Sequence, residues 1–116
     1  MDPPKPMANK LKTGFWVAAY IKRLQGNEIP VFVTKRGDPD AGAVLIKSNS
    51  LDGNAKLFHR SFDLGGVQSW MVLAEGADQL IEETIQRQQG FDPDIWVLEV
   101  EDKQGRTLLD EAGLNR

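Results

Sequence analysis

The sequence predicts a single α+β domain in which an antiparallel β-meander carries helices packed on one face. Two segments show apolar residues at helical spacing, and the stretches between them contain short β-branched and aromatic runs divided by turn residues. The elements follow in the order α-β-β-β-β-α-β. Strands that are joined by short turns pair antiparallel, which leaves the helices to cover the sheet. We expect a flexible arm at residues 1–10, which holds three prolines, and one domain at residues 11–116.

The first helix follows the arm. Aromatic and aliphatic side chains recur at helical spacing from Phe15 to Leu24. Thr13 is a suitable N-cap, because its hydroxyl can accept a hydrogen bond from a free amide of the first turn. Gly26 suits the C-terminal end of the helix, and Pro30 prevents the helix from continuing.

Four strands are expected next, at residues 31–34, 43–46, 56–59 and 70–73. The segment Arg36–Gly42 between the first two is dense in turn residues, so we expect these strands to form a hairpin. Asp52 and Gly53 predict a second hairpin turn, and Gly65 with Gly66 breaks the chain before the fourth strand.

A second helix is expected over residues 77–89, and a last strand over 95–101. Alternate residues of this strand point to opposite faces. We expect the face of Trp96, Leu98 and Val100 to be buried, and the face that carries Glu99 and Glu101 to emerge into water. A short helical or irregular tail then covers residues 107–115.

The composition excludes several classes of protein. There is no cysteine, so the chain has no disulfide, no thiolate metal site and no thiol nucleophile. The longest apolar stretch, Phe15–Ile21, is far shorter than the roughly 20 residues of a membrane-spanning helix. A cysteine-free chain without a secretory signal is typical of the cytoplasm. A net charge of -3 argues against a nucleic-acid partner.

Charge is distributed unevenly along the chain. The first 60 residues hold ten Lys/Arg and five Asp/Glu, whereas the remainder holds four and twelve. Such asymmetry is found where a basic face meets an acidic partner. It arises equally where the two halves fold together and their charges mix on one surface, and we favour this second interpretation.

Three blocks of the sequence resemble a known family. They are Phe15–Arg23, Lys35–Ala43 and Phe91–Arg106, with the patterns Phe-Trp-Val-x-Ala-Tyr-x-Lys-Arg, Lys-Arg-Gly-Asp-x-Asp-Ala-Gly-Ala and Phe-Asp-Pro-Asp-x-Trp-Val-x-Glu-Val-Glu-Asp-x-x-Gly-Arg. Together they resemble the small alphaproteobacterial family catalogued as domain of unknown function 1491, over about residues 11–110. The resemblance implies a compact bacterial protein with no assigned activity, and it supplies no catalytic residues.

The candidate residues for ligand or partner contact are Arg36, Asp38, Asp40, Trp16, Lys22, Arg23 and Arg106. An arginine can clamp a phosphate or carboxylate, and paired aspartates can offer hard oxygens to a divalent cation. The residues of the Arg36–Gly42 loop are also ordinary turn formers, which is the competing interpretation. Arg106 can bind an anion or form a local ion pair with Asp102.

Motifs for phosphate-binding loops, dinucleotide sites, zinc proteases and serine hydrolases are absent. We therefore expect no catalytic residues, metal or cofactor, and the leading hypothesis is a non-catalytic binding or interaction module with a protein partner. One alternative is a small metal- or phosphate-dependent enzyme that uses Arg36–Gly42 together with His59 or Asp102. Another is a homo-oligomer that pairs through an exposed strand edge.

Overall fold

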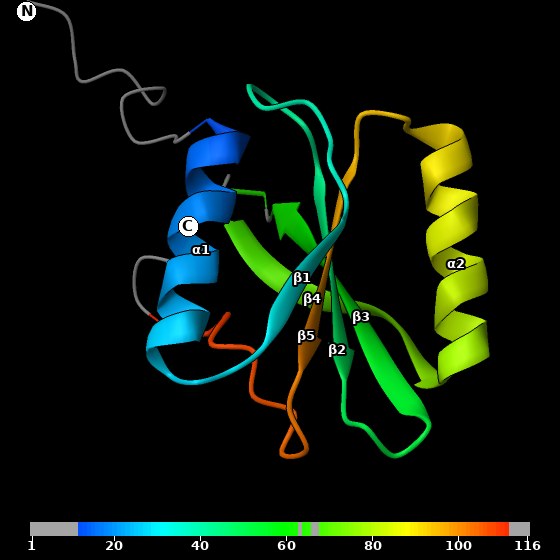
Figure 1. Ribbon diagram of the computed structural model, residues 1–116. Helices are drawn as coiled ribbons and strands as arrows, with labels where there is room; N and C mark the ends of the chain where they lie inside the picture. Colours follow the sequence, from blue (N-terminus) through cyan, green and yellow to red (C-terminus); the bar gives the residue numbers. More distant parts are fainter. Residues whose placement is uncertain (1–11, 63, 66–67, 112–116) are drawn as a thin grey trace, which may run out of the picture.

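A computed structural model describes residues 12–62, 64–65 and 68–111 of the chain (Figure 1). The predicted α+β class and the order of elements are confirmed. The elements are α1 (Thr13–Gly26), β1 (Val31–Lys35), β2 (Val44–Asn49), β3 (Asn54–Phe62), β4 (Gln68–Ala77), α2 (Asp78–Phe91) and β5 (Trp96–Glu101). The predicted arm at residues 1–10 and the end of the predicted tail lie outside the described residues.

The five strands form one sheet in the order β1-β5-β2-β3-β4. β5 lies between β1 and β2, antiparallel to the first and parallel to the second. The sheet is therefore mixed, and the predicted hairpin between β1 and β2 is wrong. The cause is the apolar run from Ile95 to Leu98, which is buried on both faces and therefore takes a central position in the sheet. The hairpins β2–β3 and β3–β4 are antiparallel, as predicted.

The two helices pack on opposite faces of the sheet (Figure 1), whereas the sequence predicts them on one face. On the α1 side the core contains Trp16, Val17, Tyr20, Leu24, Ile29, Val44, Ile46, Trp96, Leu98, Val100 and Leu109. On the α2 side it contains Leu45, Ala55, Leu57, Ile81, Ile85, Ile95 and Val97. Because β2 and β5 carry apolar side chains on both faces, each face requires a cover. The expectation that the Glu99 face of β5 meets water is wrong, since α2 covers Val97 and leaves only 20% of the Glu99 side chain exposed.

The first turn of α1 rests on the loop between β1 and β2. Lys12 occupies the N-cap position and provides no side-chain cap, so the predicted cap at Thr13 is wrong. The Thr13 hydroxyl instead donates to the carbonyl of Gly42 at 2.8 Å. The amide of Gly14 donates to the carbonyl of Pro39 at 2.8 Å. Carbonyl groups of the loop thus accept hydrogen bonds that a capping side chain would otherwise accept.

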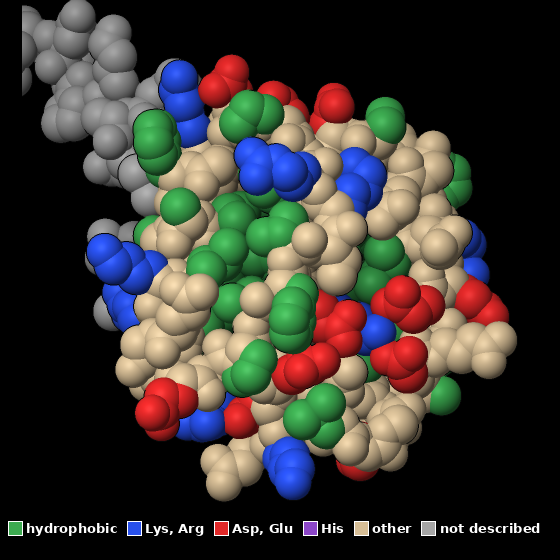
Figure 2. All heavy atoms as spheres, viewed as in Figure 1, with side chains coloured by type: hydrophobic (Ala, Val, Ile, Leu, Met, Phe, Trp, Pro, Cys, Tyr) green, Lys and Arg blue, Asp and Glu red, His purple; other side chains and the backbone are tan. Residues whose placement is uncertain are grey.

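A buried lysine joins β2, β5 and α2. The side chain of Lys47 is 4% exposed, and its Nζ lies 2.6 Å from Asp78, 2.7 Å from Glu82 and 3.7 Å from Glu99. Burial lowers the pKa of Lys47, but the hydrogen bonds to Asp78 and Glu82 and the charge of Glu99 together outweigh this effect, so that the net pKa is raised. Acidic side chains gather around a basic one beside α2 in Figure 2. The lysine therefore keeps its charge inside the fold.

We expect Lys47→Met to lower the free energy of unfolding by about 3 kcal/mol, because three carboxylates lose their shared cation. Urea denaturation measures this loss. The matched control is Lys56→Met, whose ion pair with Glu75 spans 4.0 Å between two exposed side chains. We expect about 0.5 kcal/mol or less for this control, and equal losses in the two variants would contradict the prediction.

The same ion pairs predict a dependence on pH. Because folding raises the pKa of Lys47, its contribution is fully present below the ordinary lysine value of 10.5 and is lost as the pH rises through the folded-state value. The difference in stability between the wild type and Lys47→Met should therefore shrink at strongly alkaline pH. Urea titrations of both proteins over this range measure it, and a difference that stays constant would show that the charge is not its source.

Candidate functional site

The Arg36–Gly42 loop lies against the start of β5. The Asp38 amide donates to the carbonyl of Asp94 at 2.9 Å, and the indole Nε1–H of Trp96 donates to the carbonyl of Asp38 at 2.8 Å. Gly37 has no room for a side chain, because a Cβ there would fall 2.7 Å from the Trp96 ring and closer still to the Asp94 carbonyl oxygen. The loop is thus a packed part of the fold that lies across the start of β5.

The charged side chains of this loop have local partners. The Asp38 carboxylate accepts the amide hydrogens of Asp40 and Ala41 at 3.4 and 3.2 Å, which is turn chemistry. Asp40 lies 3.6 Å from Lys12 in an exposed ion pair, and the Arg36 guanidinium lies 5.3 Å from the centre of the Trp96 ring. In the described part of the chain, no group of three or more His, Asp or Glu is placed to hold a metal ion. These contacts favour the turn interpretation of the loop.

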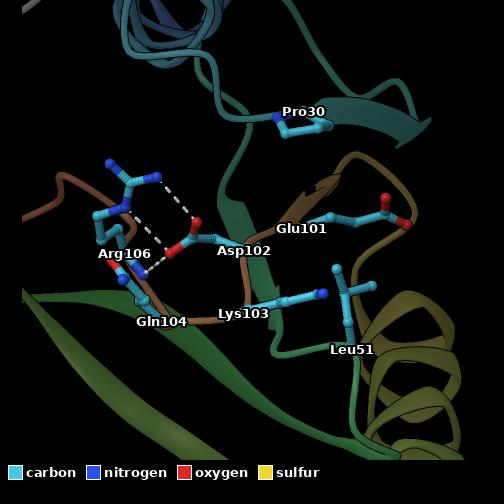
Figure 3. Close-up of a pocket in the computed structure, with 7 residues that line it drawn as sticks. All are labelled: Pro30, Leu51, Glu101, Asp102, Lys103, Gln104 and Arg106. Carbon is cyan, nitrogen blue, oxygen red and sulfur yellow. Dashed lines mark hydrogen bonds and ion pairs between the residues drawn. The ribbon is translucent and has the colours of Figure 1, made fainter.

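Arg106 forms a local ion pair with Asp102 beside a shallow pocket of about 390 Å³ (Figure 3). Its backbone amide, Nε and Nη2 donate to the Asp102 carboxylate at 2.8, 3.1 and 3.0 Å. The side-chain hydrogen bond to Arg106 lowers the pKa of Asp102, and the same bond raises the pKa of Arg106. Of the two roles predicted for Arg106, the structure shows the pairing with Asp102.

The three candidates on α1 occupy different environments. Trp16 is 3% exposed and lies in the core, because it belongs to the apolar stripe of the helix. The predicted contact of Trp16 with a partner at the outer surface is therefore wrong. Lys22 is exposed. Arg23 is half-exposed and pairs with Glu111 at 2.9 Å. Helical spacing alone does not distinguish an aromatic residue in the core from one at the rim.

Sequence reasoning missed a cluster of Arg60, Trp16 and Trp70, which we call the Arg60 cluster. The centre of the Trp16 ring lies 4.9 Å from that of Tyr20 and 5.3 Å from that of Trp70. The guanidinium carbon of Arg60 lies 5.4 Å from the centre of Trp16 and 5.7 Å from that of Trp70. Burial lowers the pKa of Arg60. One feature of the sequence indicates this cluster. Arg60 lies two residues after Phe58 in the same strand, so the two side chains point to the same face, toward the core.

A groove adjoins the Arg60 cluster. It has a volume of about 600 Å³ and lies between the β3–β4 pair and the segment at residues 104–110. Trp70 lines it together with Phe58, Leu108 and Leu109. The Tyr20 hydroxyl donates to the carbonyl of Thr107 at 2.8 Å, and this bond fixes one wall of the groove to α1.

β4 forms one edge of the sheet and is ten residues long. Met71, Val72 and Leu73 follow one another along it and are 52%, 47% and 37% exposed. β1 at the opposite edge has five residues and a register shift between Val33 and Lys35. Of the two edges, β4 therefore offers the longer apolar strand.

The fold and these features define a small α+β protein with a five-stranded mixed sheet, a helix on each face, and a cationic aromatic cluster beside an open groove. Neither helix of the described chain is long and apolar enough to cross a membrane. The chain belongs to the family described as "Protein of unknown function (DUF1491)", whose model matches residues 11–110. The family resemblance seen in the sequence is thus confirmed.

Solved structures of similar proteins share the fold. The crystal structure of a DUF1491 family protein from Caulobacter crescentus CB15 is 36% identical, with a TM-score of 0.82 over 88% of this chain and 97% of that one. An NMR structure of a DUF1491 family protein from the same organism is 37% identical, with a TM-score of 0.77 over 87% and 94%. Protein Atu0922 from A. tumefaciens is 25% identical, with a TM-score of 0.69 over 78% and 85%. No curated protein matches the chain.

The close approach at Gly37 yields a prediction. We expect Gly37→Ala to destabilise the fold by about 2 kcal/mol, because the added methyl group would push the loop away from β5. Gly26→Ala is the control, since nothing lies within 4 Å of a Cβ at this last residue of α1. This control should stabilise by up to about 1 kcal/mol. Thermal unfolding of both variants measures the effects, and a neutral Gly37→Ala would mean that the loop is not packed as described.

Proposed function

We propose that this protein is a non-catalytic interaction module that binds an extended segment of a partner protein along the outer edge of β4, the last strand of the described sheet. The observation that carries the proposal is the run of exposed apolar residues Met71, Val72 and Leu73 on an edge strand of ten residues. An extended peptide can add to such an edge, because the outward amide and carbonyl groups supply affinity and alternate side chains supply specificity.

The composition of β4 supports this role. Protected edge strands are usually short or carry lysine, proline or other charged residues. β4 carries neither lysine nor proline, and its one charged side chain is Glu75, near its end. An apolar strand of this kind suits a partner segment that is itself apolar and extended.

The non-catalytic part of the proposal rests on how the polar candidates are used. Asp38 accepts amide hydrogens of its own loop, Arg106 is tied to Asp102, and Lys47 holds three carboxylates of the fold. Groups engaged in this way serve the fold and are poorly placed to exchange protons with a substrate. The cysteine-free composition fits a reducing compartment, and we place the protein in the cytoplasm.

The test is to replace Met71 and Leu73 together by lysine, which sets two cations on the edge without altering the core. The recovery of partner proteins cross-linked in cells should be at least tenfold lower for this variant than for the wild type. A tenfold loss is the equivalent of about 1.4 kcal/mol of binding. Quantitative mass spectrometry measures the recovery. Phe91→Lys is the control, because Phe91 is 84% exposed at the end of α2 and away from the β4 edge. Undiminished recovery with the double variant would refute the proposal.

The partner segment can also be β4 of a second copy, which is the homo-oligomer expected as an alternative from the sequence. Light scattering distinguishes this case. A wild-type dimer that the Met71→Lys/Leu73→Lys variant converts to a monomer would identify self-pairing as the function of the edge. A wild type that stays monomeric leaves the edge to a different protein.

A further inference from the structure

Arg36 and Arg60 each lie over a buried tryptophan, and the two contacts differ in one respect. Under Arg36, the Nε1–H of Trp96 donates to the carbonyl of Asp38 at 2.8 Å. Under Arg60, the Nε1–H of Trp16 has no hydrogen-bond partner in the described chain, although this side chain is 3% exposed. A buried donor without an acceptor costs about 1–3 kcal/mol, so the core under Arg60 is less completely satisfied than the core under Arg36.

Arg60 is itself a cation without a counter-ion in the part of the chain that the structure describes. Lys47, Arg23 and Arg106 each lie against a carboxylate, whereas no described carboxylate forms an ion pair with Arg60. Loss of hydration on burial lowers the pKa of Arg60. The faces of the two indole rings stabilise the cation. The rings do not accept hydrogen bonds from the five N–H groups, which lie in the plane of the guanidinium.

The guanidinium of Arg60 lies over the Trp16 ring, so an anion held by Arg60 lies beside this ring. A carboxylate fits this cation. Its two oxygens match the fork of a guanidinium. Its single negative charge also balances the single cation of the cluster, whereas a phosphate dianion would bring one charge too many into a partly desolvated site.

The groove beside Trp70 indicates what the carboxylate is attached to. Phe58, Leu108 and Leu109 supply the apolar part of its lining, and polar residues that include Arg106 and Asp110 supply the rest. Its volume of about 600 Å³ lies in the usual range of small-ligand sites. Trp70 contacts Arg60 and lines this groove as well. A ligand with a carboxylate at Arg60 can therefore lay an apolar body along the groove.

We propose that the Arg60 cluster binds the carboxylate of an apolar or aromatic acid, with Arg60 as its counter-ion, while the groove beside Trp70 receives the apolar part. The acid is a small molecule or an acidic group of a partner protein. The site does not rest on the edge of β4, because Arg60 and Trp70 face α1 across the sheet surface.

The experiment is an NMR titration of the full chain that follows backbone amides and indole N–H groups at constant ionic strength. The probes are acetate, 3-phenylpropionate and inorganic phosphate. We expect both acids to move the Trp16 indole signal saturably, with 3-phenylpropionate at least tenfold tighter than acetate because it buries apolar surface in the groove. A blocked peptide with one internal glutamate tests whether an acidic side chain reaches the site, as a small acid does.

Variants make the assignment specific. Arg60→Gln should weaken the binding of 3-phenylpropionate at least tenfold. Arg60→Lys keeps a cation over the rings and should weaken this binding less. Arg36→Gln is the matched control and should bind as the wild type does, because Arg36 lies over Trp96 and neither residue lines the groove. The Met71→Lys/Leu73→Lys variant should also bind normally, which separates this site from the β4 edge. A Trp16 indole signal that no acid moves, tighter binding of phosphate, or unchanged binding by Arg60→Gln would each overturn the proposal.

Discussion

The position of β5 between β1 and β2 is the constraint on which the rest of this structure depends. A strand that is apolar on both faces must lie inside the sheet and must be covered twice. The helices therefore divide between the two faces, α1 over one and α2 over the other. The Arg36–Gly42 loop must then pass the start of β5, which accounts for the close packing at Gly37 and for the loop carbonyls that accept hydrogen bonds from the first turn of α1.

The same arrangement explains the buried charges. The parallel pairing of β2 and β5 sets Lys47 beside Glu99, and α2 brings Asp78 and Glu82 to the same point. The basic first half and acidic second half of the sequence thus meet inside one fold. The ion pairs Arg23–Glu111 and Lys56–Glu75 join the halves in the same way at the surface. Mixing of charge between the halves, the interpretation favoured from the sequence, is what these pairs show.

The polar groups and strand edges that lack a partner in the described fold are the places most available for binding. The polar residues that are most conspicuous in the sequence, such as Asp38 and Arg106, have partners in their own turns. The Arg60 cluster holds a cation without a described carboxylate and a buried indole N–H without an acceptor. The β4 edge holds an apolar strand with a neighbour on one side in the described sheet. These two places carry the proposals for a ligand and for a partner.

The sequence by itself determined the helices, most of the strands, the two consecutive hairpins and the family, because periodicity and turn chemistry are local properties. It also indicated the pairing of Arg106 with Asp102, which are four residues apart. Only the tertiary structure decided where β5 inserts, which faces the helices cover, and that Arg60 meets Trp16 and Trp70. Contacts between residues far apart in the chain depend on which strands become neighbours. Which strands become neighbours depends on burying all the apolar faces together, and this cannot be read from any one local segment.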